Sequence, residues 1–139
     1  MKILLYNSLT KQKEEFIPLR KGEVSMYVCG PTVYDYVHVG NMRPVVVFDT
    51  LRRFFNHAGY QVIYVSNYTD VDDRIIEKAQ KTNKKETEIS EFYIEAFAES
   101  ATKINALKPT FTPKATQHIE SMIAFIKVLI ANGAAYEND

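Results

Sequence analysis

At the centre of the sequence pattern lies Cys29-Gly30-Pro31-Thr32-Val33-Tyr34-Asp35-Tyr36-Val37-His38-Val39-Gly40-Asn41-Met42-Arg43, a loop between a segment with strand periodicity and one with helix periodicity. Before it, Glu23 to Val28 has apolar residues on one alternation, which predicts a strand. After it, apolar residues recur at three- or four-residue steps up to Gly59, which predicts a helix with Pro44 in its first turn. Gln61 to Ser66 is almost continuously apolar and predicts a strand buried on both faces. A strand, a helix and a strand in this order predict parallel strands with ligands at their carboxyl ends.

Three further helices are predicted after the second strand. One opens at Thr69 to Asp73, and the next spans roughly Glu88 to Leu107. The last has Thr112 or Thr116 as its cap and Gly133 as its stop. The alternation of helical and extended patterns indicates an α/β fold. The apolar positions of the last helix are Ile119, Met122, Ile123, Ile126 and Ile130.

Composition sets limits on the kind of protein. The chain has 139 residues, of which 46% are hydrophobic and 24% are charged, which is enough for one compact domain and excludes a disordered chain. No apolar stretch approaches the ~20 residues of a membrane-spanning helix. Basic and acidic residues number 17 each, so the charge gives no bulk signal for a nucleic-acid partner. Cys29 is the single cysteine, so it is inert core, a reactive thiol or a metal ligand.

The end of the loop has the chemistry of a phosphate site. His38 and Asn41 are three residues apart at a predicted helix start, where free backbone N–H groups and the helix dipole favour an anion. Gly40 lacks a Cβ, which would let a flat group such as adenine come close to the backbone. The alternative is that His38 only caps the helix and Gly40 only permits the turn.

The longer pattern resembles a known family. His38-Val39-Gly40-Asn41 is similar to the H-I-G-H element of class I aminoacyl-tRNA synthetases, with Asn41 where a second histidine often stands. The string Val28 to Arg43 resembles that of bacterial cysteinyl-tRNA synthetases. The resemblance extends through Tyr64 to Asp73 and on to Lys114-Ala115-Thr116-Gln117-His118-Ile119, and so covers essentially the whole chain.

The resemblance implies the first half of a Rossmann-like class I synthetase nucleotide-binding fold, with parallel strands and flanking helices. Residues 1–139 would be the amino-terminal part of the catalytic domain, with about 1–110 as its first half and about 111–139 as a helix leading into an insertion. The implied enzyme is a monomeric, cytoplasmic ligase with no membrane contact. It activates L-cysteine with ATP and magnesium to cysteinyl-adenylate and transfers it to tRNA(Cys). The sequence has no K-M-S-K-S-like lysine loop, so we expect the chain to be a piece that is not competent alone.

The resemblance also implies roles for single residues. His38 and Asn41 would be catalytic residues that stabilise charge on the phosphates, and Cys29 would be one ligand of a zinc ion that binds the substrate thiolate. Gly30 and Thr69 would line the amino-acid pocket, Gly30 through close approach of its backbone and Thr69 through a hydroxyl near the polar groups of the substrate. The implied ATP-binding region consists of Pro31, Thr32, Val33, Tyr34, Asp35, Tyr36, Val37, His38, Val39, Gly40 and Asn41.

Other interpretations stay open at this point. Thr69 with Asp72 or Asp73 fits a helix cap as well as a pocket. The acidic group Asp70, Asp72 and Asp73 suggests magnesium by composition, but a helix dipole favours carboxylates in the first turn, and we prefer the cap. For the whole chain the alternatives are a non-catalytic nucleotide- or zinc-binding fragment, the cysteine ligase of mycothiol biosynthesis, and a small-substrate nucleotidyltransferase. Cys29 and the extended match speak against the last of these.

Overall fold

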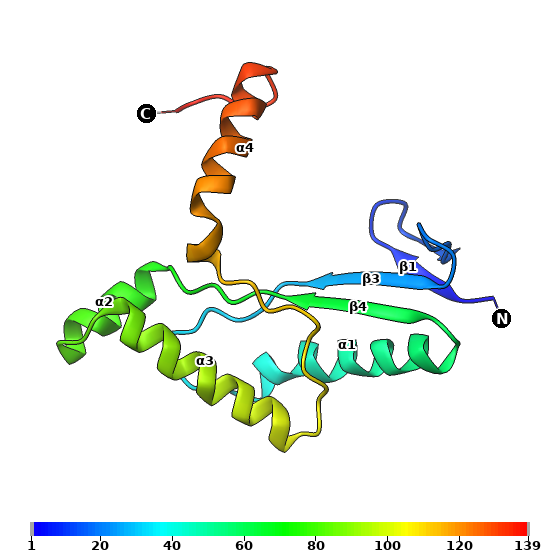
Figure 1. Cartoon of the computed structure of the whole chain (residues 1–139), viewed down its shortest axis with the longest axis horizontal. Helices are drawn as coiled ribbons and strands as arrows, with labels where there is room; N and C mark the ends of the chain where they lie inside the picture. Colours follow the sequence, from blue (N-terminus) through cyan, green and yellow to red (C-terminus); the bar gives the residue numbers. More distant parts are fainter. Residues whose placement is uncertain (1, 139) are drawn as a thin grey trace.

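The computed structural model describes residues 2–138, so Met1 and Asp139, the ends of the predicted catalytic segment, lie outside the described residues. Figure 1 shows α1 on one side of the central strands and α4 standing out on the other. The elements in chain order are β1 (Leu4–Asn7), β2 (Gln12–Glu15), β3 (Glu23–Val28), α1 (Val39–His57), β4 (Gln61–Ser66), α2 (Asp73–Thr82), α3 (Glu86–Lys103), the 3-10 turn η1 (Ala115–His118) and α4 (Ile119–Ala131).

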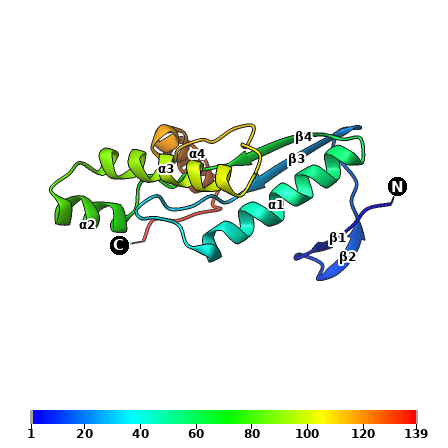
Figure 2. The same ribbon diagram turned by 90° about the horizontal axis from the view of Figure 1, so that it is seen from below.

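The central unit is a parallel pair of strands, β3 and β4, with α1 packed along one face (Figure 2). Val24 lies opposite Val62 in the register, and both belong to one hydrophobic cluster with Leu51 and Phe55 of α1. Val24 and Phe55 are 2% and 1% exposed, so the strand–helix contact is a sealed core. The predicted strand, helix and parallel strand are confirmed.

An extended segment after α3 runs along the outer edge of β4. Ser66 N donates to the Phe111 carbonyl at 3.1 Å, and Tyr68 N donates to the Pro113 carbonyl at 2.8 Å. Val65 pairs with Phe111, and Tyr68 with Lys114, as isolated parallel bridges. The sequence patterns did not predict this partner for β4, because Pro113 interrupts the segment and cannot donate to a ladder.

A second core lies beneath the loop between β3 and α1. Val33 of the loop packs with Ile75 and Ala79 of α2 and with Ile89 and Tyr93 of α3. Val33 is 2% exposed and Ile75 is 1% exposed. The two predicted helices after β4 are therefore confirmed, and together they form a fixed floor for the loop.

Two helix boundaries differ from the prediction. α1 begins at Val39, so Pro44 lies in its second turn and not in its first. The missing N–H of Pro44 leaves the Gly40 carbonyl without its usual helical partner. α3 ends before Leu107, because Asn105 takes a left-handed conformation with φ of 59°.

The start of α4 is also corrected. Neither Thr112 nor Thr116 caps it; the N-cap position is His118, whose side chain makes no capping hydrogen bond. Thr116 instead donates from its backbone N and its hydroxyl to the buried carboxylate of Asp70, at 3.0 and 2.5 Å. Asp70 therefore ties the base of α4 to the end of β4.

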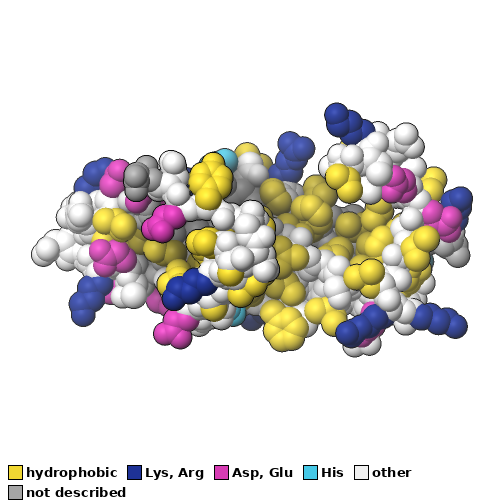
Figure 3. All heavy atoms as spheres, turned by 90° about the horizontal axis from the view of Figure 1, so that it is seen from above, with side chains coloured by type: hydrophobic (Ala, Val, Ile, Leu, Met, Phe, Trp, Pro, Cys, Tyr) yellow, Lys and Arg dark blue, Asp and Glu magenta, His cyan; other side chains and the backbone are white. Residues whose placement is uncertain are grey.

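The prediction that β4 is buried on both faces is wrong, since Tyr64 is its one buried residue. A parallel sheet is normally covered on both faces, but here α1 covers one. Figure 3 views the other face, along whose middle apolar side chains gather. Tyr27 of β3 is 67% exposed, and α4, which projects on this side, has no buried residue. The accessible surface is 10535 Å², against about 7,400 Å² for a compact monomer of this mass, so apolar surface is left uncovered within residues 2–138.

β1 and β2 form an antiparallel pair that the sequence patterns did not predict, because β2 is entirely polar. Phe16 N donates to the Ile3 carbonyl at 2.8 Å, and the Phe16 ring packs on Phe55 with centroids 5.0 Å apart. The pair is thereby joined to the α1 core. Among the helices of residues 2–138, none is both long and apolar enough to cross a membrane.

Candidate functional site

The loop after β3 is tied to the chain that follows β4. Thr69 N donates to the Pro31 carbonyl at 3.0 Å, and Val33 N donates to the Thr69 carbonyl at 3.2 Å. Thr32 and Thr69 pair as a parallel bridge. The Thr69 hydroxyl accepts from Asn67 Nδ2 at 3.4 Å. The carboxyl ends of both strands therefore continue side by side into the candidate site, and a substrate contact of the Thr69 hydroxyl stays a prediction.

Gly30 occupies the closest point of this contact. A Cβ at Gly30 would lie 1.6 Å from the carbonyl oxygen of Asn67 and 3.1 Å from Ser66 Oγ. Gly30 N also donates to Asn67 Oδ1 at 3.0 Å. The group that lies close to Gly30 in the structure is Asn67 of the same chain. Its role in an amino-acid pocket stays a prediction.

His38 and Asn41 form a reciprocal cap at the start of α1. His38 Nδ1 accepts from Gly40 N at 3.0 Å, and Asn41 Oδ1 accepts from His38 N at 3.0 Å. Two backbone donors that a helix start leaves free are thus satisfied. The capping interpretation of His38 that the sequence left open is what the structure shows.

This cap also orients the remaining donors of both side chains. A neutral imidazole has one acceptor nitrogen and one N–H, so a His38 Nδ1 that accepts places the proton on Nε2. An Asn41 amide whose oxygen is engaged keeps its NH₂ free to donate. Both residues are exposed. Capping and anion binding use different atoms of these side chains, so the cap is compatible with the predicted role.

Gly40 is required by the histidine ring. A Cβ at Gly40 would lie 2.8 Å from His38 Cε1 and 3.0 Å from His38 Nδ1. Any larger residue would push the ring out of its capping position. The space that we expected Gly40 to leave for a nucleotide is therefore partly taken by His38, and the approach of adenine stays a prediction.

A cleft of about 170 Å³ separates the end of β3 from the start of α1. We call it the motif cleft; its wall includes Cys29, Gly30 and Pro31 on one side and Gly40 and Asn41 on the other. Cys29 is exposed, and its thiol approaches the Gly30 carbonyl, with Sγ to O at 3.6 Å. The fold therefore brings the predicted metal ligand to the predicted phosphate motif. His38 and Thr69 lie beside this cleft and do not line it.

Cys29 does not form a metal site with its neighbours. Among residues 2–138, no three His, Cys, Asp or Glu side chains lie together as a metal site requires. A zinc site takes three or four protein ligands, and Cys29 supplies one. The described residues alone therefore do not fit a bound zinc ion.

The acidic residues after β4 are divided between separate tasks. Asp72 caps α2, since its side chain accepts from Arg74 N at 3.0 Å. Its carboxylate also pairs with the Arg74 side chain, and this hydrogen bond lowers the pKa of Asp72. Asp70 instead binds Thr116. The preferred interpretation as a cap is confirmed for Asp72, and the three acids do not gather as magnesium ligands.

Comparison with known sequences shows the family to which the chain belongs. The sequence model of the family described as "tRNA synthetases class I (C) catalytic domain" matches residues 15–139. The chain belongs to this family. The cysteine–tRNA ligase of Lachnoclostridium phytofermentans is 56% identical over 135 residues, which is 97% of this chain. That of Staphylococcus haemolyticus is 50% identical over 137 residues, or 99% of the chain. The chain spans 29% of the length of each of these relatives.

In this class I synthetase domain, α2 supports the loop through residues that the sequence analysis missed. The Arg74 guanidinium lies 4.7 Å from the centre of the Tyr34 ring, and its Nη2 donates to Thr32 Oγ1 at 3.2 Å. Lys78 pairs with Asp35 at 3.0 Å and lies over the Tyr93 ring. The hydrogen bond from Lys78 lowers the pKa of Asp35, helped by the Tyr36 backbone N–H. The spacing of Arg74 and Lys78 on one helix face was the available signal.

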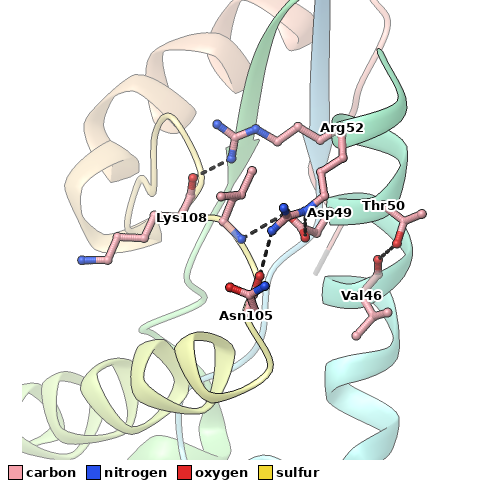
Figure 4. A network of polar contacts seen from close by, with 8 residues as sticks. Val46, Asp49, Thr50, Arg52, Asn105 and Lys108 are labelled. Atoms are coloured by element: carbon pink, nitrogen blue, oxygen red, sulfur yellow. Dashed lines mark hydrogen bonds and ion pairs between the residues drawn. The ribbon is translucent and has the colours of Figure 1, made fainter. Parts of the chain in front are cut away.

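α1 of the synthetase domain is also clamped at its middle (Figure 4). Asp49, which is 8% exposed, accepts from Leu107 N at 3.0 Å and from Arg53 Nε at 2.8 Å. Arg53 Nη2 donates to the Asn105 carbonyl at 2.8 Å, and Arg52 Nη1 donates to the Lys108 carbonyl at 2.6 Å. These contacts join α1 to the turn after α3. A buried acid on the apolar side of a helix was the signal, and the sequence analysis passed over Asp49.

Proposed function

We propose that this chain forms the amino-terminal part of the catalytic domain of a cysteine–tRNA ligase. The observation that carries the proposal is the motif cleft, in which Cys29 and Gly30 at the carboxyl end of β3 face Gly40 and Asn41 at the start of α1. In a parallel α/β fold, ligands bind at the carboxyl ends of strands. About 1–110 then belongs to the first half of the nucleotide-binding fold, and about 111–139 leads toward an insertion.

The proposed reaction is activation of L-cysteine by ATP, with magnesium, to cysteinyl-adenylate and pyrophosphate, followed by transfer to tRNA(Cys). The start of α1 presents an electropositive helix end to the phosphates. The free N–H of His38 Nε2 and the Asn41 amide donate to the charge that develops on them. Because the cap fixes both side chains beforehand, little reorganisation is needed when the nucleotide binds.

Cys29 is proposed as one ligand of a zinc ion that selects the thiol of cysteine. Zinc bonds thiolate strongly and a hydroxyl poorly, so this ligand chemistry suits discrimination against serine. Among residues 2–138, Cys29 belongs to no group of three His, Cys, Asp or Glu side chains, so further ligands would have to come from outside them.

The names of the matched relatives support tRNA as the acceptor over the amino sugar of the mycothiol-pathway ligase. We further propose that the enzyme is a monomer and that it acts in the cytoplasm, where tRNA is charged. The chain alone is proposed not to aminoacylate tRNA.

The test is cysteine-dependent ATP–pyrophosphate exchange by a protein of the relatives' length that contains this sequence. His38→Ala is expected to lower the exchange rate by about a hundredfold or more, the usual cost of losing one such donor. His57→Ala, at the far end of the same helix, is the matched control and should exchange like the wild type. An unchanged rate in His38→Ala contradicts the proposal.

Zinc content measured in the same samples tests Cys29. Cys29→Ser is expected to lose both zinc and cysteine activation. Retention of both would show that the thiol is not a ligand, while leaving the His38 result as a separate test of the phosphate site.

A further inference from the structure

A second hollow lies behind the motif cleft, between β4, α1 and α3. It has a volume of about 290 Å³ and shares Val45, Tyr64, Ser66 and Phe97 with the motif cleft. We call it the apolar recess. The two hollows are adjacent, because the same four side chains stand in both walls.

The recess exists because one face of α3 carries small side chains. Ile94, Phe97, Ala98 and Ala101 lie at positions i, i+3, i+4 and i+7, the stripe that a helix turns toward its core. Two of these four positions are alanine, where a helix packed tightly on a sheet would carry larger side chains. The space that larger residues would fill is the recess.

Its wall suits an apolar occupant better than water. Tyr64, Tyr68 and Phe97 supply aromatic surface, and burial raises the pKa of the Tyr64 and Tyr68 hydroxyls. Both oxygens of Asp49 already accept hydrogen bonds from elsewhere, and the Thr102 hydroxyl donates to the Ala98 carbonyl at 2.9 Å. Ordered water needs two to four polar partners, which this wall offers sparsely.

We propose that the apolar recess is a binding site for a small, uncharged aromatic molecule of one or two fused rings. An apolar cavity of about 150 Å³ holds benzene, so about 290 Å³ leaves room for a second ring. Tyr68 and Phe97 already meet edge to face, with centroids 5.9 Å apart, and a flat ligand extends this preferred aromatic packing. The site is formed by β4, α1, α3 and the segment 106–112 that follows α3. It shares no catalytic group with the proposed ligase reaction, so it does not rest on that activity.

The probe for the test is indole, titrated into the 139-residue chain while amide chemical shifts are recorded. We expect saturable shifts centred on Ala98 and Leu107 of the recess wall. Ala101→Phe fills the recess and is expected to weaken indole binding at least tenfold. Ala124→Phe makes the same substitution on α4, outside the recess, and is expected to bind like the wild type.

Three results overturn the proposal: no saturable binding to the wild type, equal affinity in Ala101→Phe, or shifts centred on α4 and the uncovered sheet face. If circular dichroism shows that Ala101→Phe is unfolded, Ala98→Leu replaces it with a smaller increase in volume. Indole binding to Ala98→Leu as tight as to the wild type then overturns the site.

Discussion

Replacing Gly30 by alanine is the sharpest test of how β3, the loop and the chain after β4 are held together. The new Cβ would lie 1.6 Å from the Asn67 carbonyl oxygen, whereas real Cβ atoms essentially never come within 3.0 Å of a neighbour. The difference between these two distances is about 1.4 Å. The atom in the way belongs to the backbone, so the two chain segments must separate by about that distance.

Such a separation breaks the hydrogen bonds that join these segments. The bonds at stake are Gly30 N to Asn67 Oδ1 at 3.0 Å, Thr69 N to the Pro31 carbonyl at 3.0 Å, and Val33 N to the Thr69 carbonyl at 3.2 Å. Each contributes about 1 kcal/mol, so Gly30→Ala is expected to cost about 3 kcal/mol. That is a large part of the ~5 to 15 kcal/mol by which a domain is stable.

The assay is urea unfolding followed by circular dichroism at the amide wavelengths. Gly59→Ala is the matched control, because nothing lies within 4 Å of its added Cβ and its φ is +90°. Backbone strain alone is expected to cost it ~1 to 2 kcal/mol. If Gly30→Ala loses no more stability than Gly59→Ala, the clash argument is refuted.

Three further predictions concern the groups that hold α1, α4 and the loop. Asp49→Ala leaves the Leu107 N–H and Arg53 without their acceptor, so urea unfolding should show a free energy of unfolding lower by about 1–3 kcal/mol. Thr50→Ala, on the exposed side of α1, is the control and should change this free energy by no more than about 0.5 kcal/mol. Equal losses in the two variants would contradict the proposed role of Asp49 in joining α1 to the turn after α3. Asp70→Ala should speed hydrogen exchange of the Thr116 amide, whereas Asp73→Ala should not, and an unchanged rate in Asp70→Ala would exclude the anchor. The pKa of Asp35 is lowered by Lys78 from its ordinary value of 3.8, so its stabilising contribution is present above pH 3.8 and is lost as pH falls through the lowered pKa. Asp35→Asn should therefore be less stable than the wild type at pH 7, with the gap closing below pH 3.8 in parallel urea titrations; a gap independent of pH would count against the ion pair.

Sequence patterns predicted the fold where local periodicity and tertiary packing agree. Glu23–Val28 and Gln61–Ser66 alternate or run apolar because they pack on α1, and both strands were predicted with the bounds that the structure has. β1 and β2 could not be predicted in the same way. β2 is polar throughout and is held by pairing with β1, a contact that no single-strand pattern reveals.

The sequence predicted which residues belong to the candidate site, but not all the contacts that those residues make. The sequence placed Cys29, Gly30, Gly40 and Asn41 in one loop, and the fold gathers them at one cleft. It could not show that Asn67 meets Gly30, because that contact depends on how the chain leaves β4. Periodicity within one segment does not reveal contacts between segments that are far apart in the sequence. The contact of Asp49 with Leu107 is of this kind, so Asp49 was overlooked.

The cap at the start of α1 explains why one short motif can serve stability and chemistry together. His38 accepts through Nδ1 and Asn41 accepts through Oδ1, and these are the atoms that a phosphate, itself an acceptor, cannot use. The donors that an anion needs are the atoms left over. A residue that can accept the capping hydrogen bond but has no N–H to donate should therefore separate capping from phosphate binding. In His38→Asp the side chain can still cap the helix, but its carboxylate repels a phosphate. We expect His38→Asp to keep the free energy of unfolding of the wild type within about 0.5 kcal/mol, while ATP–pyrophosphate exchange by the protein of the relatives' length is lost. Unfolding and exchange that fall together would mean that the histidine acts through the cap alone.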